Sequence, residues 1–273
     1  MAGTHDRVPI DGDVTVASAA RMLDYLLGDA RNFAADRRLA EVLRHAVPDI
    51  DLLVRLGRTF MRHAVTHLVG AGVHQFLDLS VGTTAIGNVH EVAQAIVPTC
   101  RVVYAHADPI SVVHTSQLLA DAERTAVLHA DPRDARKIMT ACRDDKLLDI
   151  TAPIGLMMAS GLALLPASAN LANMVSRYRR CVVGGSHLVI SHITGDRRPV
   201  DVTNLVRVMN ASRDPVQPRT RDEVIRLFSG FELVPPGVVD PGQWQLERSL
   251  SAAEEVAATM VYVGVGRKPG SRA

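Results

Sequence analysis

The sequence predicts an α/β protein built on a mostly parallel sheet, in which strands alternate with helices. Between residues 75 and 193, short apolar runs end in polar or glycine-containing turns, and a helical pattern follows most of them. From residue 17 to 72, apolar residues recur every three or four positions, which is typical of helices. Alternating strands and helices favour parallel pairing with right-handed crossovers.

Composition and charge exclude several classes of protein. The chain has 273 residues, 47% hydrophobic and 4% aromatic, so Val, Leu, Ile, Ala and Met must supply most of the core. The net charge is +1, and no Lys/Arg cluster predicts binding to nucleic acid or to a membrane. Cys100, Cys142 and Cys181 are too scattered for a disulfide framework or a zinc site. Without a signal peptide or an apolar run of roughly 18 residues, we expect a cytoplasmic protein.

The chain divides into a tail, a helical segment and a core. Residues 1–16 are polar and contain Gly and Pro, which predicts a flexible tail. Residues 17–72 predict three helices that form an N-terminal cap, and Gly70 and Gly72 close the third. Residues 73–273 predict the sheet-bearing core, which forms one domain with the cap.

Within this core, five strands are expected before the first of two further helices. These strands cover residues 75–79, 101–105, 126–130, 154–159 and 187–193. Beyond Pro199 two helices follow, and the second opens with a capping box from Thr220 to Glu223. Residues 231–234 and 259–265 predict two last strands that pair antiparallel.

Ligands of open α/β sheets bind beyond the carboxyl ends of the strands, so the residues there are candidates. Asp78 ends the first strand, and a turn containing Ser80 and Gly82 lets backbone approach a ligand, although a tight turn needs glycine anyway. After the second strand, Asp108 can accept both hydroxyls of a ribose or can cap the helix that starts at Pro109.

Further polar candidates are less specific. Asp131, after the third strand, can accept from an adenine amino group or can cap a helix. His192, after the fifth strand, is a candidate general base, and an ordinary half-buried histidine is the competing interpretation. His63 and His67 lie four apart without the glutamate of a zinc-protease motif, so we expect a polar helix face and no metal.

Several longer stretches resemble one family across the chain from Ala20 to Pro269. The resemblance is to an actinobacterial family of S-adenosylmethionine-dependent methyltransferases, long catalogued as a domain of unknown function. The stretches that carry it are Ala20–Gly28, Asn32–Arg37, Gln75–Asp78, Gly87–Ala93, His129–Asp131, Ser186–His192, Pro218–Arg221 and Gly230–Val234.

The resemblance implies a class I methyltransferase fold, which is Rossmann-like, with a seven-stranded, mostly parallel sheet and N-terminal helices over the cofactor cleft. It implies S-adenosylmethionine as the cofactor. The apolar residues after the fourth strand, from Leu162 to Pro166, favour a small, largely apolar metabolite as the substrate. The implied cofactor-binding positions are Asp78, Ser80, Gly82, His106, Asp108, Asp131 and Ala159. The implied substrate-binding positions are Met22, Tyr25, Phe33, Met158 and Leu162.

The sequence departs from this family where the cofactor is expected. Ser80 and Val81 replace a glycine and a serine, and a Pro-Thr pair is replaced by Thr84-Ala85. His106 replaces an aspartate, so one acceptor stands in place of two. After the fourth strand the family's Leu-His-Phe-Val-Pro becomes Leu-Ala-Leu-Leu-Pro.

These departures predict weakened cofactor binding, because each lost charge-assisted hydrogen bond costs about one to two decades of affinity. Three functions therefore remain open. The first is a methyltransferase for a small apolar acceptor. The second is a non-methylating cyclase or isomerase of secondary metabolism on the same fold. The third is a catalytically silent binding protein.

Overall fold

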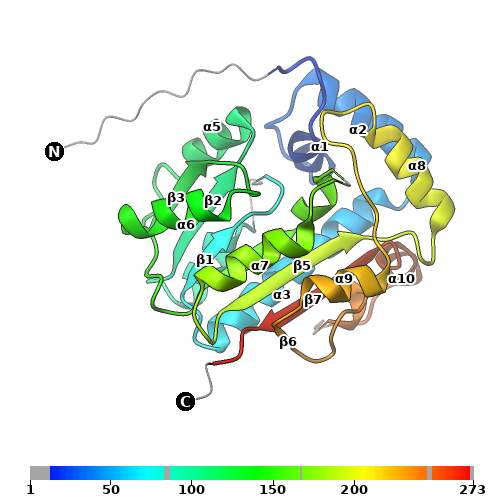
Figure 1. The fold of residues 1–273 in the computed structure, drawn as a ribbon. Helices are drawn as coiled ribbons and strands as arrows, with labels where there is room; N and C mark the ends of the chain where they lie inside the picture. The colour runs from blue at the N-terminus through cyan, green and yellow to red at the C-terminus, as the bar shows by residue number, and fades with distance from the viewer. Residues whose placement is uncertain (1–12, 83–86, 167, 245–247, 271–273) are drawn as a thin grey trace.

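The computed structural model describes residues 13–82, 87–166, 168–244 and 248–270 (Figure 1). Its sheet has seven strands in the order β3-β2-β1-β4-β5-β7-β6. The first five pair in parallel, whereas β7 runs antiparallel to both of its neighbours. The strands are β1 (Gln75–Asp78), β2 (Arg101–His106), β3 (Thr125–His129), β4 (Gly155–Ala159), β5 (His187–Ile193), β6 (Glu232–Leu233) and β7 (Val261–Arg267).

This sheet confirms the predicted fold class, including the antiparallel closing pair. The last two strands differ from the expectation in their bounds. The strand expected at 231–234 has only two residues, and β7 begins at Val261 because a helix, α10 (Ala252–Ala258), precedes it. Ser251 and Glu254 form a capping box that starts this helix, which the sequence analysis did not predict.

Helices cover both faces of the sheet. One face carries α3 (Ile50–Gly70), α4 (Val89–Ile96) and α5 (Pro109–Leu118). The other carries α6 (Ala135–Asp144), α7 (Leu171–Cys181) and α9 (Arg221–Leu227). Neighbouring strand residues alternate between the two cores, as strand geometry requires. Phe76 and Met157 pack on the α3 side, and Leu77 and Met158 pack on the α7 side.

Three more helices gather beside the carboxyl ends of β4 and β5 (Figure 1). They are α1 (Ala19–Leu26), α2 (Ala34–Ala46) and α8 (Pro199–Met209). A buried ion pair joins α1 to α2, because Arg21 Nε donates to Asp36 Oδ2 at 2.8 Å. Asp36 also accepts from the backbone of Ser18 and Phe33, so one carboxylate fixes the start of both helices.

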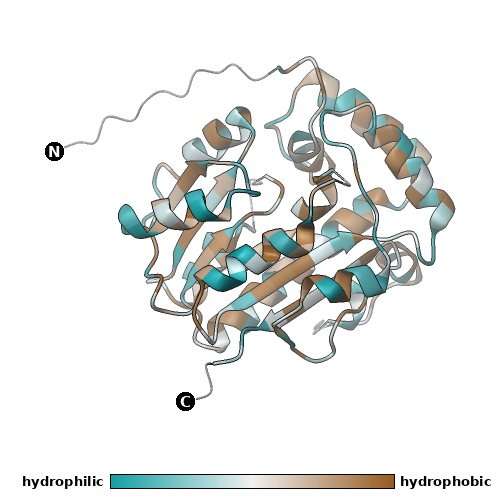
Figure 2. Ribbon diagram, in the orientation of Figure 1, coloured by the Kyte–Doolittle hydropathy of each residue, from teal (hydrophilic) through white to brown (hydrophobic). Residues whose placement is uncertain are grey.

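Apolar residues concentrate in the central strands, and the helices carry both apolar and polar residues (Figure 2). No helix in the described ranges has the length and apolar character that crossing a membrane requires. Two short 3-10 turns complete the described elements. One, η1 (Gly161–Leu164), directly follows β4, and the other, η2 (Pro241–Gln243), precedes α10. Strand order reverses between β1 and β4, so a crevice is expected beyond their carboxyl ends.

Candidate functional site

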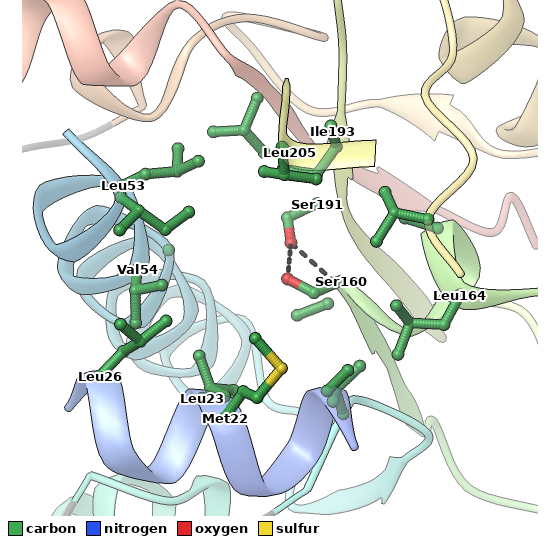
Figure 3. Close-up of a pocket in the computed structure, with 18 of the residues that line it drawn as sticks. Met22, Leu23, Leu26, Leu53, Val54, Ser160, Leu164, Ser191, Ile193 and Leu205 are labelled. Carbon is green, nitrogen blue, oxygen red and sulfur yellow. Dashed lines mark hydrogen bonds between the residues drawn. The ribbon is translucent and has the colours of Figure 1, made fainter. Parts of the chain in front are cut away.

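Two adjoining cavities lie at the carboxyl ends of the strands. The first, here called the strand-end cleft, has a volume of about 970 Å³ and is lined by the residues after β1, β2 and β3 and by η1. The second, the apolar pocket, has a volume of about 1030 Å³ and lies between α1, α3, α8 and the ends of β4 and β5 (Figure 3). Ser80, Val81 and Leu164 line both cavities, so the two meet there.

The turn after β1 brings backbone close to the cleft. The buried Asp78 accepts from the Ser80 backbone N–H at 2.8 Å, and burial raises the pKa of its carboxyl group. Gly82 has φ +59°, and a Cβ there would lie 2.9 Å from the Cβ of Ala20. Similarly, a Cβ on Gly161 would lie 2.7 Å from the carbonyl oxygen of Leu79. Both positions therefore require glycine.

Ser80 has a structural partner that the sequence did not indicate. Its Oγ accepts from the backbone N–H of Ala159 at 3.1 Å and so ties the first turn to the end of β4. A glycine at this position would lack this hydrogen bond. The Thr84-Ala85 departure lies outside the described residues.

His106 lies in the wall of the cleft at the end of β2. The side chain is 4% exposed, and burial lowers its pKa to about 4, so the imidazole is neutral at pH 7. Its ring stacks on Tyr104 with the centroids 6.2 Å apart. Within the described ranges, His106 Nε2 has no hydrogen-bond partner. Because His106 also lines the cleft, this nitrogen can form a hydrogen bond with a group bound there.

Asp108 and Asp131 also line the cleft, and their carboxylates already bind protein groups. Asp108 caps α5 by accepting from the Ser111 backbone N–H at 2.9 Å, and it accepts from Arg213 Nη1 at 3.0 Å. The capping interpretation is therefore correct for this residue. Asp131 accepts from Arg133 Nε at 2.9 Å and from the Arg133 backbone N–H at 2.8 Å. It does not cap α6, whose N-cap is Asp134.

The apolar pocket is lined almost entirely by aliphatic side chains (Figure 3). Its polar members are Arg58 and the hydroxyls of Ser80, Ser160 and Ser191. Arg58 Nη2 donates to the carbonyl of Gly87 at 2.7 Å, so its guanidinium has a protein partner. The aliphatic and sulfur-containing lining includes Met22, Leu23, Leu26, Leu53, Val54, Leu164, Ile193 and Leu205.

Two of the predicted substrate residues line a cavity, but not the same one. Met22 lines the apolar pocket, whereas Leu162 lines the strand-end cleft. Ala159, predicted at the cofactor, lines the apolar pocket. Tyr25 contacts neither cavity, because its hydroxyl donates to Glu41 on the cap surface at 2.8 Å. The structure thus places Tyr25 on the cap, outside the pocket in which the sequence predicted it.

Phe33, Met158 and His192 also lie away from both cavities. The Phe33 ring packs against the Arg21 guanidinium, 5.5 Å away. Met158 belongs to the core beneath α6 and α7, since it alternates with Met157 and Ala159 along β4. His192 is excluded for the same reason, because its neighbours Ser191 and Ile193 occupy the pocket face of β5.

His192 instead serves the structure of the opposite face. Its Nε2 accepts from Arg219 Nη1 at 2.8 Å, and burial lowers its pKa to about 4. The structure places His192 outside both cavities, with the contacts of a buried structural histidine, which is the competing interpretation. Within the described ranges, no group of three His, Cys, Asp or Glu side chains can hold a metal ion.

Sequence reasoning missed several lining residues. Leu23 and Leu26 lie on the α1 stripe that includes Met22, so helical spacing could have found them. Ser191 could have been found from strand alternation next to Ile193. Ser160 gave no signal, because its unusual backbone conformation is visible only in the structure.

Comparison with known proteins assigns the chain to a family. The family model described as S-adenosyl methyltransferase matches residues 5–269. The chain belongs to this family. A member of the DUF574 family from Streptomyces avermitilis is 31% identical, with 94% of this chain and 99% of that chain covered and a TM-score of 0.87. None of the curated proteins compared with the chain matches it.

Two further solved structures are similar to the chain. A "putative methyltransferase" from Thermobifida fusca is 30% identical, with 94% of this chain and 97% of that chain covered and a TM-score of 0.86. An O-methyltransferase family protein from Burkholderia thailandensis is 12% identical, covers 82% of this chain and 59% of that chain, and has a TM-score of 0.53. The second similarity shows the fold alone.

S-adenosylmethionine is the cofactor of this S-adenosyl methyltransferase family. The strand-end cleft fits such a group in position and in its lining. It lies where nucleotides bind in open α/β sheets, and Gly82 and Gly161 are part of its wall. The buried, unpartnered His106 Nε2 adds a polar atom to its wall.

Proposed function

We propose that this chain transfers the methyl group of S-adenosylmethionine, held in the strand-end cleft, to a small, largely apolar acceptor held in the apolar pocket. The observation that carries this proposal is the junction of the two cavities at Ser80, Val81 and Leu164. Groups bound in the two cavities would lie next to each other at this junction. Ligand sites with mostly apolar walls and few polar anchors are typical of small-molecule enzymes.

The residues of the chain bind and orient, and the bound cofactor supplies an electrophilic methyl group on a sulfonium sulfur. Ser80 and Gly82 shape the cleft after β1, and His106 and Asp108 shape it after β2. The described lining of the apolar pocket contains no carboxylate or imidazole. Catalysis therefore rests on proximity and alignment of the two reactants, which can supply several kcal/mol of a barrier.

One observation favours a second candidate, a cyclase or isomerase that binds no cofactor. The carboxylates of Asp108 and Asp131 already accept hydrogen bonds from Arg213 and Arg133. If neither carboxylate exchanges its partner for a ligand, the cleft loses its strongest polar contacts. Cofactor affinity therefore separates the two candidates.

The test is calorimetric titration of the full chain with S-adenosylmethionine. We expect binding by the wild type and about tenfold tighter binding by His106→Asp, which provides two acceptors in place of one. Ser80→Gly is the matched comparison. It should not tighten binding, and it should lower the free energy of unfolding by about 1 kcal/mol, because the Ala159 N–H loses its acceptor.

Absence of binding by both the wild type and His106→Asp would overturn the methyltransferase proposal. That result would favour the cofactor-free candidate. Equal affinities for the wild type and His106→Asp would show instead that the histidine serves the cleft as well as an aspartate does.

A further inference from the structure

Among the few polar groups in the wall of the apolar pocket, the hydroxyls of Ser160 and Ser191 lie next to each other (Figure 3). Ser160 directly follows β4 and has a left-handed backbone, with φ 60° and ψ −22°. This conformation costs a residue with a Cβ about 1–2 kcal/mol, so glycine is the usual choice. Ser160 is exposed although Ala159 and Leu162 around it are buried, and it lines the pocket.

Hydrogen bonds to β5 hold Ser160 in place. Its backbone N–H donates to Ser191 Oγ at 2.9 Å and to the Ser191 carbonyl at 3.1 Å. The two hydroxyl oxygens lie 3.2 Å apart, so one hydroxyl donates to the other. Strand pairing of Ala159 with Ser191 fixes the register of this contact.

Either hydroxyl can donate in this geometry, and the burial of Ser191 favours Ser191 as the donor. Ser191 is 2% exposed, so the Ser160 oxygen is the acceptor that the structure offers to its proton. A hydroxyl group carries one proton and two lone pairs. Once Ser191 donates to Ser160, the Ser160 proton is directed to the pocket, where a ligand can accept it.

We infer that Ser160, oriented by Ser191, is the polar anchor of the acceptor site and selects neutral, largely apolar molecules that carry a hydrogen-bond-accepting hydroxyl or carbonyl oxygen. The inference rests on the proposed function. Charged acceptors fit poorly, because an apolar wall does not stabilise a buried charge. Among the described lining residues only Arg58 carries a charge, and its guanidinium already donates to the carbonyl of Gly87.

The anchor also lies on the cofactor side of the pocket. Ala159, the neighbour of Ser160, donates its N–H to Ser80 Oγ, and Ser80 lines both cavities. An oxygen bound to Ser160 is therefore held near the junction of the cavities. Ser160 is a positioning and specificity residue in this arrangement, and it takes no proton from the acceptor.

A matched pair of probes tests the anchor. 2-Naphthol and 2-methylnaphthalene have nearly the same size, and only the first carries an oxygen. We would titrate each into the full chain and follow the naphthalene fluorescence. We expect the wild type to bind 2-naphthol about 3- to 10-fold more tightly than 2-methylnaphthalene, which is the value of one neutral hydrogen bond.

Ser160→Gly should bring the affinity ratio of the two probes close to one while 2-methylnaphthalene affinity stays the same. Glycine adopts the left-handed conformation readily, so this variant keeps the backbone and loses only the hydroxyl. Ser191→Ala should reduce the ratio as well, since it removes the partner that orients Ser160. Ser116→Ala, on the exposed side of α5, is the control and should leave the ratio unchanged.

A ratio that stays the same in Ser160→Gly would overturn the inference, and so would a wild type that binds neither probe or binds 2-naphthol no more tightly. Titration of the same preparations with S-adenosylmethionine keeps the two proposals separate. If the chain binds the cofactor and the probe ratio is unchanged in Ser160→Gly, the inference about Ser160 is wrong and the proposed function stands. If the probe ratio depends on Ser160 but the chain does not bind the cofactor, the proposed function is wrong and the inference about Ser160 stands.

Discussion

Gly57 offers a way to close the apolar pocket without touching the strand-end cleft. It lies in the interior of α3 and lines the apolar pocket, and a Cβ built on it has no heavy atom within 4 Å. Glycine in a helix interior is about 0.8–1.0 kcal/mol less favourable than alanine. Gly57→Ala should therefore raise the free energy of unfolding by about this amount and raise Tm by about 2–4 °C.

Gly57→Leu extends the same test to ligand binding. Leucine is also a good helix former, and its side chain would project into the space that the acceptor needs. Overpacking costs typically 1–3 kcal/mol, which corresponds to roughly 5- to 150-fold in affinity for a molecule that occupies the pocket. Since the strand-end cleft does not include Gly57, the affinity for S-adenosylmethionine should stay within about twofold of the wild type.

The assay combines urea denaturation with titration by 2-naphthol and by S-adenosylmethionine. Gly70→Ala and Gly70→Leu are the controls, because Gly70 ends the same helix, is exposed and lines neither cavity. Loss of cofactor binding in Gly57→Leu with intact 2-naphthol binding would refute the assignment of the two cavities. A fall in stability for Gly57→Ala would show that the space beside α3 is already filled.

Three further predictions follow from buried groups. His106→Phe should raise the free energy of unfolding of the free chain by about 1 kcal/mol, because it removes a buried polar atom that the described residues leave without a partner. It should also weaken S-adenosylmethionine binding about 3- to 10-fold. Urea denaturation and calorimetry measure the two effects, and lower stability with unchanged affinity would contradict the prediction. Folded His106 and His192 have pKa values of about 4 against about 6.5 when unfolded, so the unfolded chain binds more protons between these values. Stability should then fall on acidification below pH 6.5 by about 1.4 kcal/mol per pH unit for each histidine, and equal urea midpoints at pH 7 and 5 would exclude this. Asp36→Asn should cost about 3–5 kcal/mol because it leaves the buried Arg21 charge uncompensated, and a loss below about 1 kcal/mol would show that the pair does not hold α1 to α2.

Periodicity in the sequence predicted most of the fold. The alternation of apolar runs with helical stripes identified the parallel sheet and its antiparallel closing pair. It missed α10, a seven-residue helix too short for an apolar stripe to stand out, although its capping box at Ser251 was readable. The strand expected at 231–234 was longer than β6, because Phe231 and Val234 are apolar but lie outside the two residues that pair with β7.

The site was predictable by position but not by side-chain partner. The rule of strand carboxyl ends placed Ser80 and Gly82 at the cleft, and the family resemblance added His106. Strict use of strand alternation would have excluded Met158 from the pocket and would have chosen Ser191 in place of His192. The ion pair between Asp108 and Arg213 joins residues 105 positions apart, so no local pattern could reveal that this carboxylate is engaged.

A crystal structure of the full chain grown with S-adenosylhomocysteine, the product of methyl transfer, tests the central claim most directly. The account predicts ligand density in the strand-end cleft, in contact with the turn at Ser80 and Gly82 and with His106, while the apolar pocket stays free for the acceptor. Density in the apolar pocket instead, or an empty cleft at millimolar ligand, would contradict the account.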